Sequence, residues 1–177
     1  MIETLVFDTG PLSHFAKQNW LGVLKAIVGE RVALIPDTVL VELELGANRD
    51  SRLQAVLDAH WIERRELTSD AELRAYATFA GLLVARSRNR GEAGVLALAS
   101  TIPNAVAIVD DAAARKAADA NHIAKRPTLV LLCEGIRAGL LTVPLVAALA
   151  DDLLVSKYHL PFRAGGFEAW ARENDLV

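Results

Sequence analysis

Short apolar runs alternate with longer segments of helical periodicity along the chain. Residues 4–7, 31–35 and 106–109 are apolar runs that turn-forming or acidic residues follow at once, a pattern typical of buried strands. Residues 61–67 are ambiguous and suit an edge strand. Continuous apolar strands joined by helical crossovers indicate a parallel sheet with helices on both faces. The predicted fold is therefore a three-layer α/β/α sandwich with a central parallel sheet.

Helical segments are predicted between the strands. Pro11 suits the first turn of one helix, and Val39, Leu43 and Ala47 form one apolar stripe of a helix that begins near Pro36. Further helices are expected over residues 20–28, 51–59, 69–85, 91–100 and 112–120.

The helix expected over residues 69–85 carries the clearest start signal. Ser69 can cap its N-terminus, and Glu72 three residues later completes a capping box. Apolar residues at helical spacing predict its buried stripe: Leu73, Ala77, Ala80, Leu83 and Val84.

Composition narrows the class of protein. The chain has 177 residues, 53% of them hydrophobic, and a net charge of −3, and its mean hydropathy is +0.27. These values favour one rigid globular domain and argue against a disordered chain. The single cysteine, Cys133, lies between apolar residues as a buried filler. We expect a cytoplasmic protein without membrane contact, because neither a signal peptide nor a membrane-spanning run is recognisable.

Acidic residues gather where the predicted strands end. Asp8 follows the first strand, Asp110 and Asp111 follow the strand at 106–109, and Glu92 begins the helix that leads into that strand. Glu42 lies one turn into the helix after the second strand. Because ligands bind beyond the carboxyl ends of parallel strands, we expect these side chains to converge.

Each acid also has a purely structural explanation. Asp8 or Asp111 could cap a helix, Glu92 could favour a helix dipole, and Glu42 could be solvated. Capping does not require Asp110 beside Asp111, however, and converging carboxylates repel each other unless a cation compensates them. Oxygen ligands favour Mg²⁺ or Mn²⁺ over Zn²⁺. The histidines show no ligand spacing: His14, His60, His122 and His159.

Four motifs together resemble PIN-domain ribonucleases, the family that includes the toxins of VapBC-type toxin–antitoxin modules. They are VFDTGPL, VELELG, RGEAGVLALA and VDDAAARKAADANHI, in that order along the chain. The resemblance implies a PIN-like fold and a Mg²⁺- or Mn²⁺-dependent site that cleaves RNA and leaves 5′-phosphate and 3′-hydroxyl ends. It places the catalytic acids at Asp8, Glu42, Glu92 and Asp111, with Asp110 as a fifth member, and the metal ligands at Asp8, Glu92, Asp111 and Asp110.

The choice between the adjacent aspartates stays open at this point. The spacing from the second of them to Arg115, Ala118 and Ile123 favours Asp111 as the principal ligand, and a shift by one residue stays as the alternative. The segment RPTLVLLCEGIRAGLLT resembles a PIN subgroup in which a glycine stands where Pro127 is found here.

Basic and hydroxyl residues near the acids are the expected contacts for RNA phosphates. The run at 86–90 leads directly into Glu92, although it could equally be a solvated loop. The expected substrate-binding residues are Thr9, Arg86, Arg88, Arg90, Arg115 and Thr128.

The resemblance covers the chain to about residue 141. We therefore expect a PIN-like nuclease domain over residues 1–141 and a C-terminal helical extension, residues 142–177, packed on the same domain. The resemblance implies three partners: an RNA substrate, a small antitoxin protein and a second copy of the chain in a homodimer.

Other classes of protein fit less well. A phosphatase of the haloacid dehalogenase type needs a second aspartate two residues after the first, where this chain has Gly10. A response-regulator receiver would place its acidic pair near the first strand. A catalytically weak PIN-like module that binds RNA or a partner protein remains the main alternative.

Overall fold

The computed structural model describes residues 2–83 and 89–177. In these residues five parallel strands form one sheet, in the order β3-β2-β1-β4-β5. The central strand β1 pairs along its whole length with β4, so that Phe7 lies opposite Ile108. All five strands therefore end at the same edge of the sheet. Their bounds are β1 (Thr4–Phe7), β2 (Val32–Pro36), β3 (Ile62–Arg65), β4 (Ala105–Ile108) and β5 (Lys125–Arg126).

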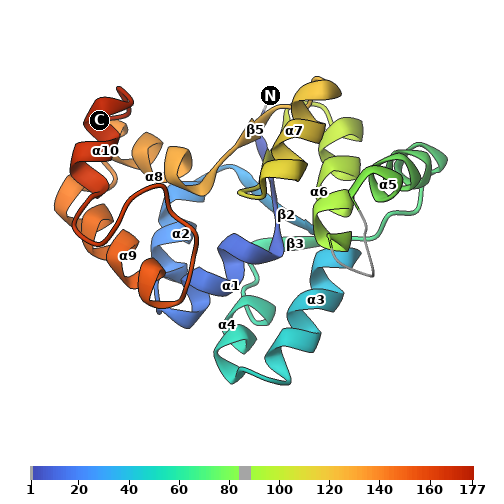
Figure 1. Ribbon diagram of the computed structural model, residues 1–177. Coiled ribbons are helices and arrows are strands. Elements are labelled where there is room, and N and C mark those ends of the chain that lie inside the picture. The colour runs from blue at the N-terminus through green and yellow to red at the C-terminus, as the bar shows by residue number, and fades with distance from the viewer. Residues whose placement is uncertain (1, 84–88) are drawn as a thin grey trace.

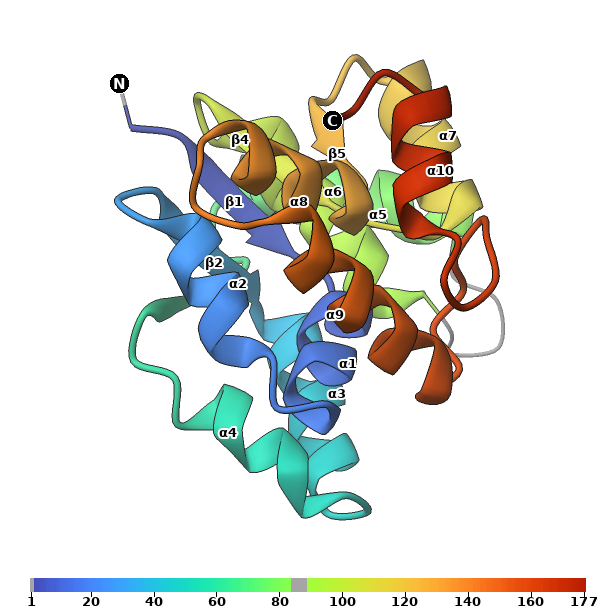
Figure 2. The same ribbon diagram turned by 90° about the vertical axis from the view of Figure 1, so that its left-hand side faces the viewer.

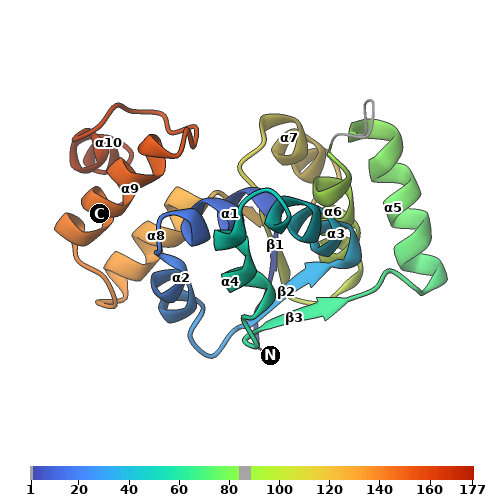
Figure 3. The same ribbon diagram turned by 90° about the horizontal axis from the view of Figure 1, so that it is seen from below.

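Helices cover both faces of the sheet, which confirms the predicted three layers (Figures 1 and 3). One layer holds α1 (Thr9–Lys17), α2 (Leu21–Val28) and α8 (Thr128–Arg137), and the other holds α5 (Asp70–Leu83), α6 (Arg90–Thr101) and α7 (Ala112–Ala120). Helix α3 (Asp37–Ala47) packs against α6 and α1. The chain then passes through a 3₁₀ turn (Ser51–Leu53) and α4 (Gln54–Leu57) before it reaches β3.

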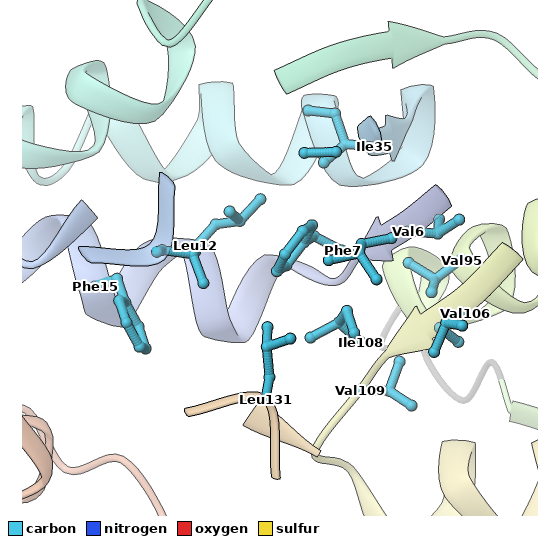
Figure 4. Packing of buried hydrophobic residues seen from close by; sticks show 14 of the residues in the cluster. Val6, Phe7, Leu12, Phe15, Ile35, Val95, Val106, Ile108, Val109 and Leu131 are labelled. Atoms are coloured by element: carbon cyan, nitrogen blue, oxygen red, sulfur yellow. The ribbon is translucent and has the colours of Figure 1, made fainter. Parts of the chain in front are cut away.

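The core lies on both faces of β1 and β4, whose side chains are almost all buried. Figure 4 shows Phe7 near Ile108 and near Leu131 of α8, and it shows Val95 of α6 on the right, near Val6. Cys133 is also fully buried, as predicted, and burial raises the pKa of its thiol to about 11. Burial on both faces explains why these strands read as continuous apolar runs.

Most predicted elements are confirmed, with small shifts at their ends. Helix α7 has the predicted bounds, residues 112–120, and the ambiguous segment at 61–67 contains the edge strand β3. The helix expected over 51–59 is wrong in extent, because the chain forms a 3₁₀ turn followed by a four-residue helix. Strand β5 was missed, since its two residues, Lys125 and Arg126, are charged and give no apolar signal.

The buried stripe predicted for α5 is only partly correct. Leu83 is buried as predicted, but Leu73 is 49% exposed and Ala77 is also exposed. Glu72 and Phe79, which were not predicted, are buried. The capping box holds the buried Glu72 carboxylate, and the buried face of α5, which contacts α6, is shifted by about one residue from most of the predicted stripe. Ala80 is half-buried as part of the true face, and Val84 lies outside the described residues.

The C-terminal residues form α9 (Val143–Val155) and α10 (Phe167–Glu173). Helix α9 lies beside α1 and α8 (Figure 2), and α10 contacts α9. The Trp20 indole donates to Asp152 at 2.8 Å, and the His14 ring lies 2.7 Å from the Ser156 hydroxyl. These contacts join residues far apart in sequence. The domain boundary at residue 141 stays a prediction. In the described part of the chain, no helix is long and apolar enough to cross a membrane.

Candidate active site

Asp8 is the most deeply placed of the predicted acids. It follows β1 directly, is only 8% exposed, and its Oδ2 accepts a long hydrogen bond of 3.5 Å from the Gly10 amide at the start of α1. The capping explanation is therefore correct for one of its oxygens. The other oxygen, Oδ1, is buried and has no hydrogen-bond partner. Such an atom carries the full cost of desolvation unless a ligand meets it.

Glu42 reaches the same place from α3. Its carboxylate accepts a 2.5 Å hydrogen bond from the Thr9 hydroxyl and a 3.0 Å hydrogen bond from the Gly91 amide. It is half-buried, unlike the exposed Glu44, so the solvated alternative is wrong for it. Through its hydrogen bond, the Thr9 hydroxyl orients the Glu42 carboxylate at the N-terminus of α1.

Gly91 allows the two acids to approach each other. A Cβ atom at this position would lie 2.7 Å from Glu42 Oε2 and 3.1 Å from Asp8 Oδ1. Only a residue without a side chain leaves room for both carboxylates against the first turn of α6. Gly91 was not among the predicted site residues, although a glycine directly before Glu92 in the first turn of a helix was the available signal.

Glu92 completes the electrostatic cluster. Burial, followed by the charges of Glu42 and Asp111, raises the pKa of Glu92. Burial also raises the pKa of Asp8 well above its usual range, and the negative charges of Glu92 and Glu42 add to this effect. Asp8, Glu42 and Glu92 therefore interact electrostatically, as predicted from the strand ends, and Asp111 joins them through Glu92.

The adjacent aspartates at the end of β4 point to different partners. Asp111 caps α7 by accepting from the Ala114 amide at 2.8 Å, and its side chain is exposed. Asp110 accepts from both the amide and the hydroxyl of Thr128, at 2.9 and 2.6 Å, and from the Tyr158 hydroxyl. Both oxygens of Asp110 are thus used to fix the N-terminus of α8.

Tyr158 was missed by the sequence analysis. It follows α9, is 8% exposed, and its hydroxyl also lies 3.2 Å from the hydroxyl of Thr128. Burial and the negative charge of Asp110 raise the pKa of Tyr158 well above its usual range, so it stays a neutral donor. No local signal connects it to Asp110, because 48 residues separate the two in sequence.

Only some of the basic residues predicted to contact RNA lie within the described residues. Arg86 and Arg88 lie outside the described residues, and Arg90 begins α6 next to Gly91. Arg115 lies one turn after Asp111 on α7, and its Nε atom is buried without a hydrogen-bond partner. Thr128 is engaged by Asp110 and lies almost fully buried, at 1% exposure.

The acids do not form a closed metal-binding group by themselves. Within residues 2–83 and 89–177, no three acidic, histidine or cysteine side chains lie together in an arrangement that could hold a metal ion. Asp8 Oδ1 nevertheless remains buried and unpaired beside two further carboxylates. This oxygen-only donor set has the chemistry that suits a hard divalent cation.

The fold is thus a three-layer α/β/α sandwich with a five-stranded parallel sheet, and acids from four elements lie at the carboxyl edge of that sheet. We next compared the chain with known protein families. The family model DUF3368, described as a PIN domain, matches residues 4–163. The chain therefore belongs to the PIN-domain family, which confirms the resemblance drawn from the motifs.

A solved structure supports the same fold. The chain is similar to a chain in the crystal structure of VapBC2 from Rickettsia felis bound to a DNA fragment from its promoter, with a TM-score of 0.51 and 14% identity. The match covers 70% of this chain and 98% of that chain. At this identity it shows the fold alone. No significant match is found among curated proteins.

Proposed function

We propose that the chain is a metal-dependent endoribonuclease whose catalytic acids are Asp8, Glu42, Glu92 and Asp111. PIN domains are typically nucleases. The observation that supports the location of the site is the buried, unpaired Oδ1 atom of Asp8 beside Glu42. Buried carboxylates with raised pKa values, such as Asp8 and Glu92, are typical of functional sites.

The four acids have separable roles in this proposal. Asp8 is the principal ligand of an Mg²⁺ or Mn²⁺ ion, and Asp111 and Glu92 bind it directly or through water. Glu42 is held by Thr9 and Gly91, so it keeps a fixed carboxylate beside Asp8. Mg²⁺ usually keeps several waters and takes only one or two protein carboxylates, so a site without a closed set of protein ligands fits it. When bound, the ion supplies Lewis acidity and a water of lowered pKa for phosphodiester hydrolysis.

Asp110 is assigned a positioning role rather than that of a metal ligand. Three donors already occupy its two oxygens, whereas Asp111 keeps an exposed carboxylate that acts electrostatically on Glu92. These contacts support Asp111, rather than Asp110, as the proposed metal ligand.

Cleavage of a mixed single-stranded RNA pool by the purified chain tests the activity. We expect cleavage with Mg²⁺ or Mn²⁺, none in EDTA, and a loss of at least 100-fold in Asp8→Asn and Asp111→Asn. Asp58→Asn, which changes an exposed aspartate beyond the site, is the matched control and keeps full activity. Cleavage that persists in EDTA, or in both site variants, contradicts the mechanism. Absence of cleavage under every condition favours the alternative, a catalytically weak PIN module.

The biological role that we propose is that of a toxin kept inactive by a small antitoxin. The support is the PIN family and the likeness to a chain of a VapBC complex. Induced expression of the chain in a bacterial host is then expected to arrest growth, and Asp8→Asn is expected to abolish the arrest. Normal growth with active, soluble enzyme present contradicts the toxin role without affecting the nuclease.

We also propose that the chain forms a homodimer. Val41 and Leu45, which lie one turn apart on α3, are 52% and 58% exposed, and burial of such residues stabilises association. Light scattering should give twice the mass of one chain, and Leu45→Lys should give the mass of one. A single-chain mass for the unaltered protein contradicts the dimer.

A further inference from the structure

A small pocket of about 240 Å³ lies beside Asp110, between the nuclease fold and the C-terminal helices. Arg115 of α7 and Leu129 of α8 contribute one side of it, and His159, Pro161 and Trp170 of the C-terminal residues contribute the other. Figure 2 shows α10 in front of α7, which agrees with this lining. We call it the base pocket.

A second hollow of about 430 Å³ adjoins the base pocket. Arg115 and Pro127 line both, so the two spaces share a wall. The second hollow adds Lys116 and Lys125, and its one acid is Asp119, which pairs with Lys125. It therefore presents a surplus of positive charge next to a pocket with aromatic and apolar walls. We call it the basic hollow.

Two observations indicate that these spaces take a ligand. Arg115 Nε is buried without a hydrogen-bond partner, although a guanidinium group donates in a fixed geometry that suits a phosphate. Trp170 is half-buried, with its ring 5.4 Å from the ring of Phe162 and 6.4 Å from that of Phe167. These neighbours hold the indole in place, so stacking on it costs little side-chain entropy.

We propose that the base pocket takes one unstacked base of single-stranded RNA, with the flanking phosphates against Arg115 and the basic hollow. A positively charged track beside an aromatic platform is the arrangement by which proteins bind single strands. The pocket is smaller than cavities for drug-sized ligands, which begin at roughly 300 Å³, and so suits a single base. This inference rests on the proposed ribonuclease function, since Asp110 in the pocket wall is adjacent to Asp111.

RNA binding measured in EDTA tests the pocket without any cleavage. The full chain is titrated into a short, fluorescently labelled single-stranded RNA, and the anisotropy is followed. Trp170→Leu should weaken binding roughly five- to hundredfold, because it removes a stacking surface, whereas Trp170→Phe should keep most of the affinity. Arg115→Gln should lower the slope of log K against log salt by about 0.7. Trp61→Leu and Arg74→Gln, outside both hollows, are the matched controls.

A second readout uses the unaltered chain and so does not depend on how a variant folds. Tryptophan fluorescence of the unaltered chain should be quenched by the RNA and much less by an RNA of equal length that lacks its bases. Equal quenching by the two RNAs, equal binding of Trp170→Leu and the unaltered chain, or no binding of single strands overturns the base pocket. Neither measurement requires a metal or catalysis. The base pocket can therefore be contradicted while the ribonuclease proposal is supported, and the ribonuclease proposal can be contradicted while the base pocket is supported.

Discussion

At the scale of single residues, Gly91 sets how closely Asp8 and Glu42 can approach. The Gly91→Ala methyl group would lie 2.7 Å from Glu42 Oε2, so that carboxylate must move away from its hydrogen bonds to Thr9 and Gly91. We expect RNA cleavage to fall roughly 10- to 100-fold, since small displacements of reacting groups cost about this much. A cleavage time course with the same RNA measures it.

The matched control is Gly81→Ala in α5, where an added Cβ meets nothing within 4 Å. This variant should cleave RNA normally and melt at the same or a higher temperature, because alanine favours helices by up to about 1 kcal/mol over glycine. Full activity of Gly91→Ala would show that the close approach of the two carboxylates does not matter for catalysis.

The residue scale also shows how far the sequence could specify the site. Strand ends and motif order predicted that Asp8, Glu42 and Glu92 would lie close together. Their negative charges do act on one another, since Glu42 and Glu92 help to raise the pKa of Asp8, and Glu42 helps to raise that of Glu92. The role of Asp110 could not be predicted, because it depends on Tyr158, which reaches it only through the folded arrangement of α8 and α9. Patterns within one stretch of chain carry no information on such distant partners.

At the scale of elements, α5 is held at its N-terminus by a reciprocal capping box. The Glu72 carboxylate accepts from the Ser69 amide at 2.9 Å and from its hydroxyl at 2.8 Å, and the Ser69 hydroxyl accepts from the Glu72 amide at 3.2 Å. Arg65 donates to the same carboxylate at 2.7 Å. The hydrogen bonds from Ser69, assisted by those from Thr68 and the charge of Arg65, lower the pKa of Glu72 to about 2.

Glu72→Gln keeps one accepting oxygen for the cap but loses the negative charge and one of the two oxygens that accept from Arg65 and Ser69. It should lower the free energy of unfolding by about 1 kcal/mol at pH 7, the usual contribution of a hydrogen bond. The folded pKa of Glu72 lies below its unfolded value of about 4.5. Its contribution is therefore complete above pH 4.5 and is lost as the pH falls toward 2. Urea unfolding at pH 7, 5 and 3.5 should show a gap between the two proteins that narrows at the lowest pH. A gap that stays constant down to pH 3.5 would exclude this origin, and Glu63→Gln on β3 serves as an exposed control.

The N-terminus of α8 depends on a residue from outside its own element. Tyr158→Phe removes one of the three donors to Asp110 while it keeps the ring against His14, whose centroid lies 4.7 Å away. We expect a loss of about 1 kcal/mol in the free energy of unfolding, because a half-buried acceptor loses one of its hydrogen bonds. Because Asp110 positions α8 and is not a metal ligand in our proposal, RNA cleavage should change less than fivefold.

Chemical denaturation and the cleavage assay, run on one preparation, check the two parts of this expectation. Tyr76→Phe, a half-buried tyrosine on α5, is the control. A cleavage loss as large as that of Asp111→Asn, with stability unchanged, would instead make Asp110 part of the catalytic group.

The element scale separates what local patterns can predict from what packing decides. Helix α7 was predicted to the residue, because its cap Asp111 and its small apolar face are both local signals. The exposed and buried faces of α5 were confused because a buried glutamate does not resemble a core residue in sequence. Strand β5 depends on Arg126, which pairs at 2.7 Å with Glu3, 123 residues away in sequence, and at 2.9 Å with Glu134 of the following helix α8.

At the scale of the whole molecule, the acidic cluster is a cost to folding that a bound cation would offset. Asp8 is buried, has an unpaired oxygen and has its pKa raised by burial and by two neighbouring carboxylates. Replacement of this carboxyl group by a neutral amide removes both the desolvation of a charge and its repulsion from Glu92 and Glu42. In EDTA at pH 7, Asp8→Asn should therefore melt at a higher temperature than the unaltered chain.

Mn²⁺ should reverse this order or close the gap. An ion at 100 times its dissociation constant stabilises the folded state by about 2.7 kcal/mol, which raises the melting midpoint of a chain of this size by roughly 5–10 °C. The unaltered protein should show this rise, and Asp8→Asn should show little of it because a principal ligand is gone. Asp58→Asn should behave as the unaltered chain in both conditions. If Asp8→Asn melts lower in EDTA and gains as much from Mn²⁺, the buried carboxylate is neither the electrostatic cost nor the ligand that we assign to it.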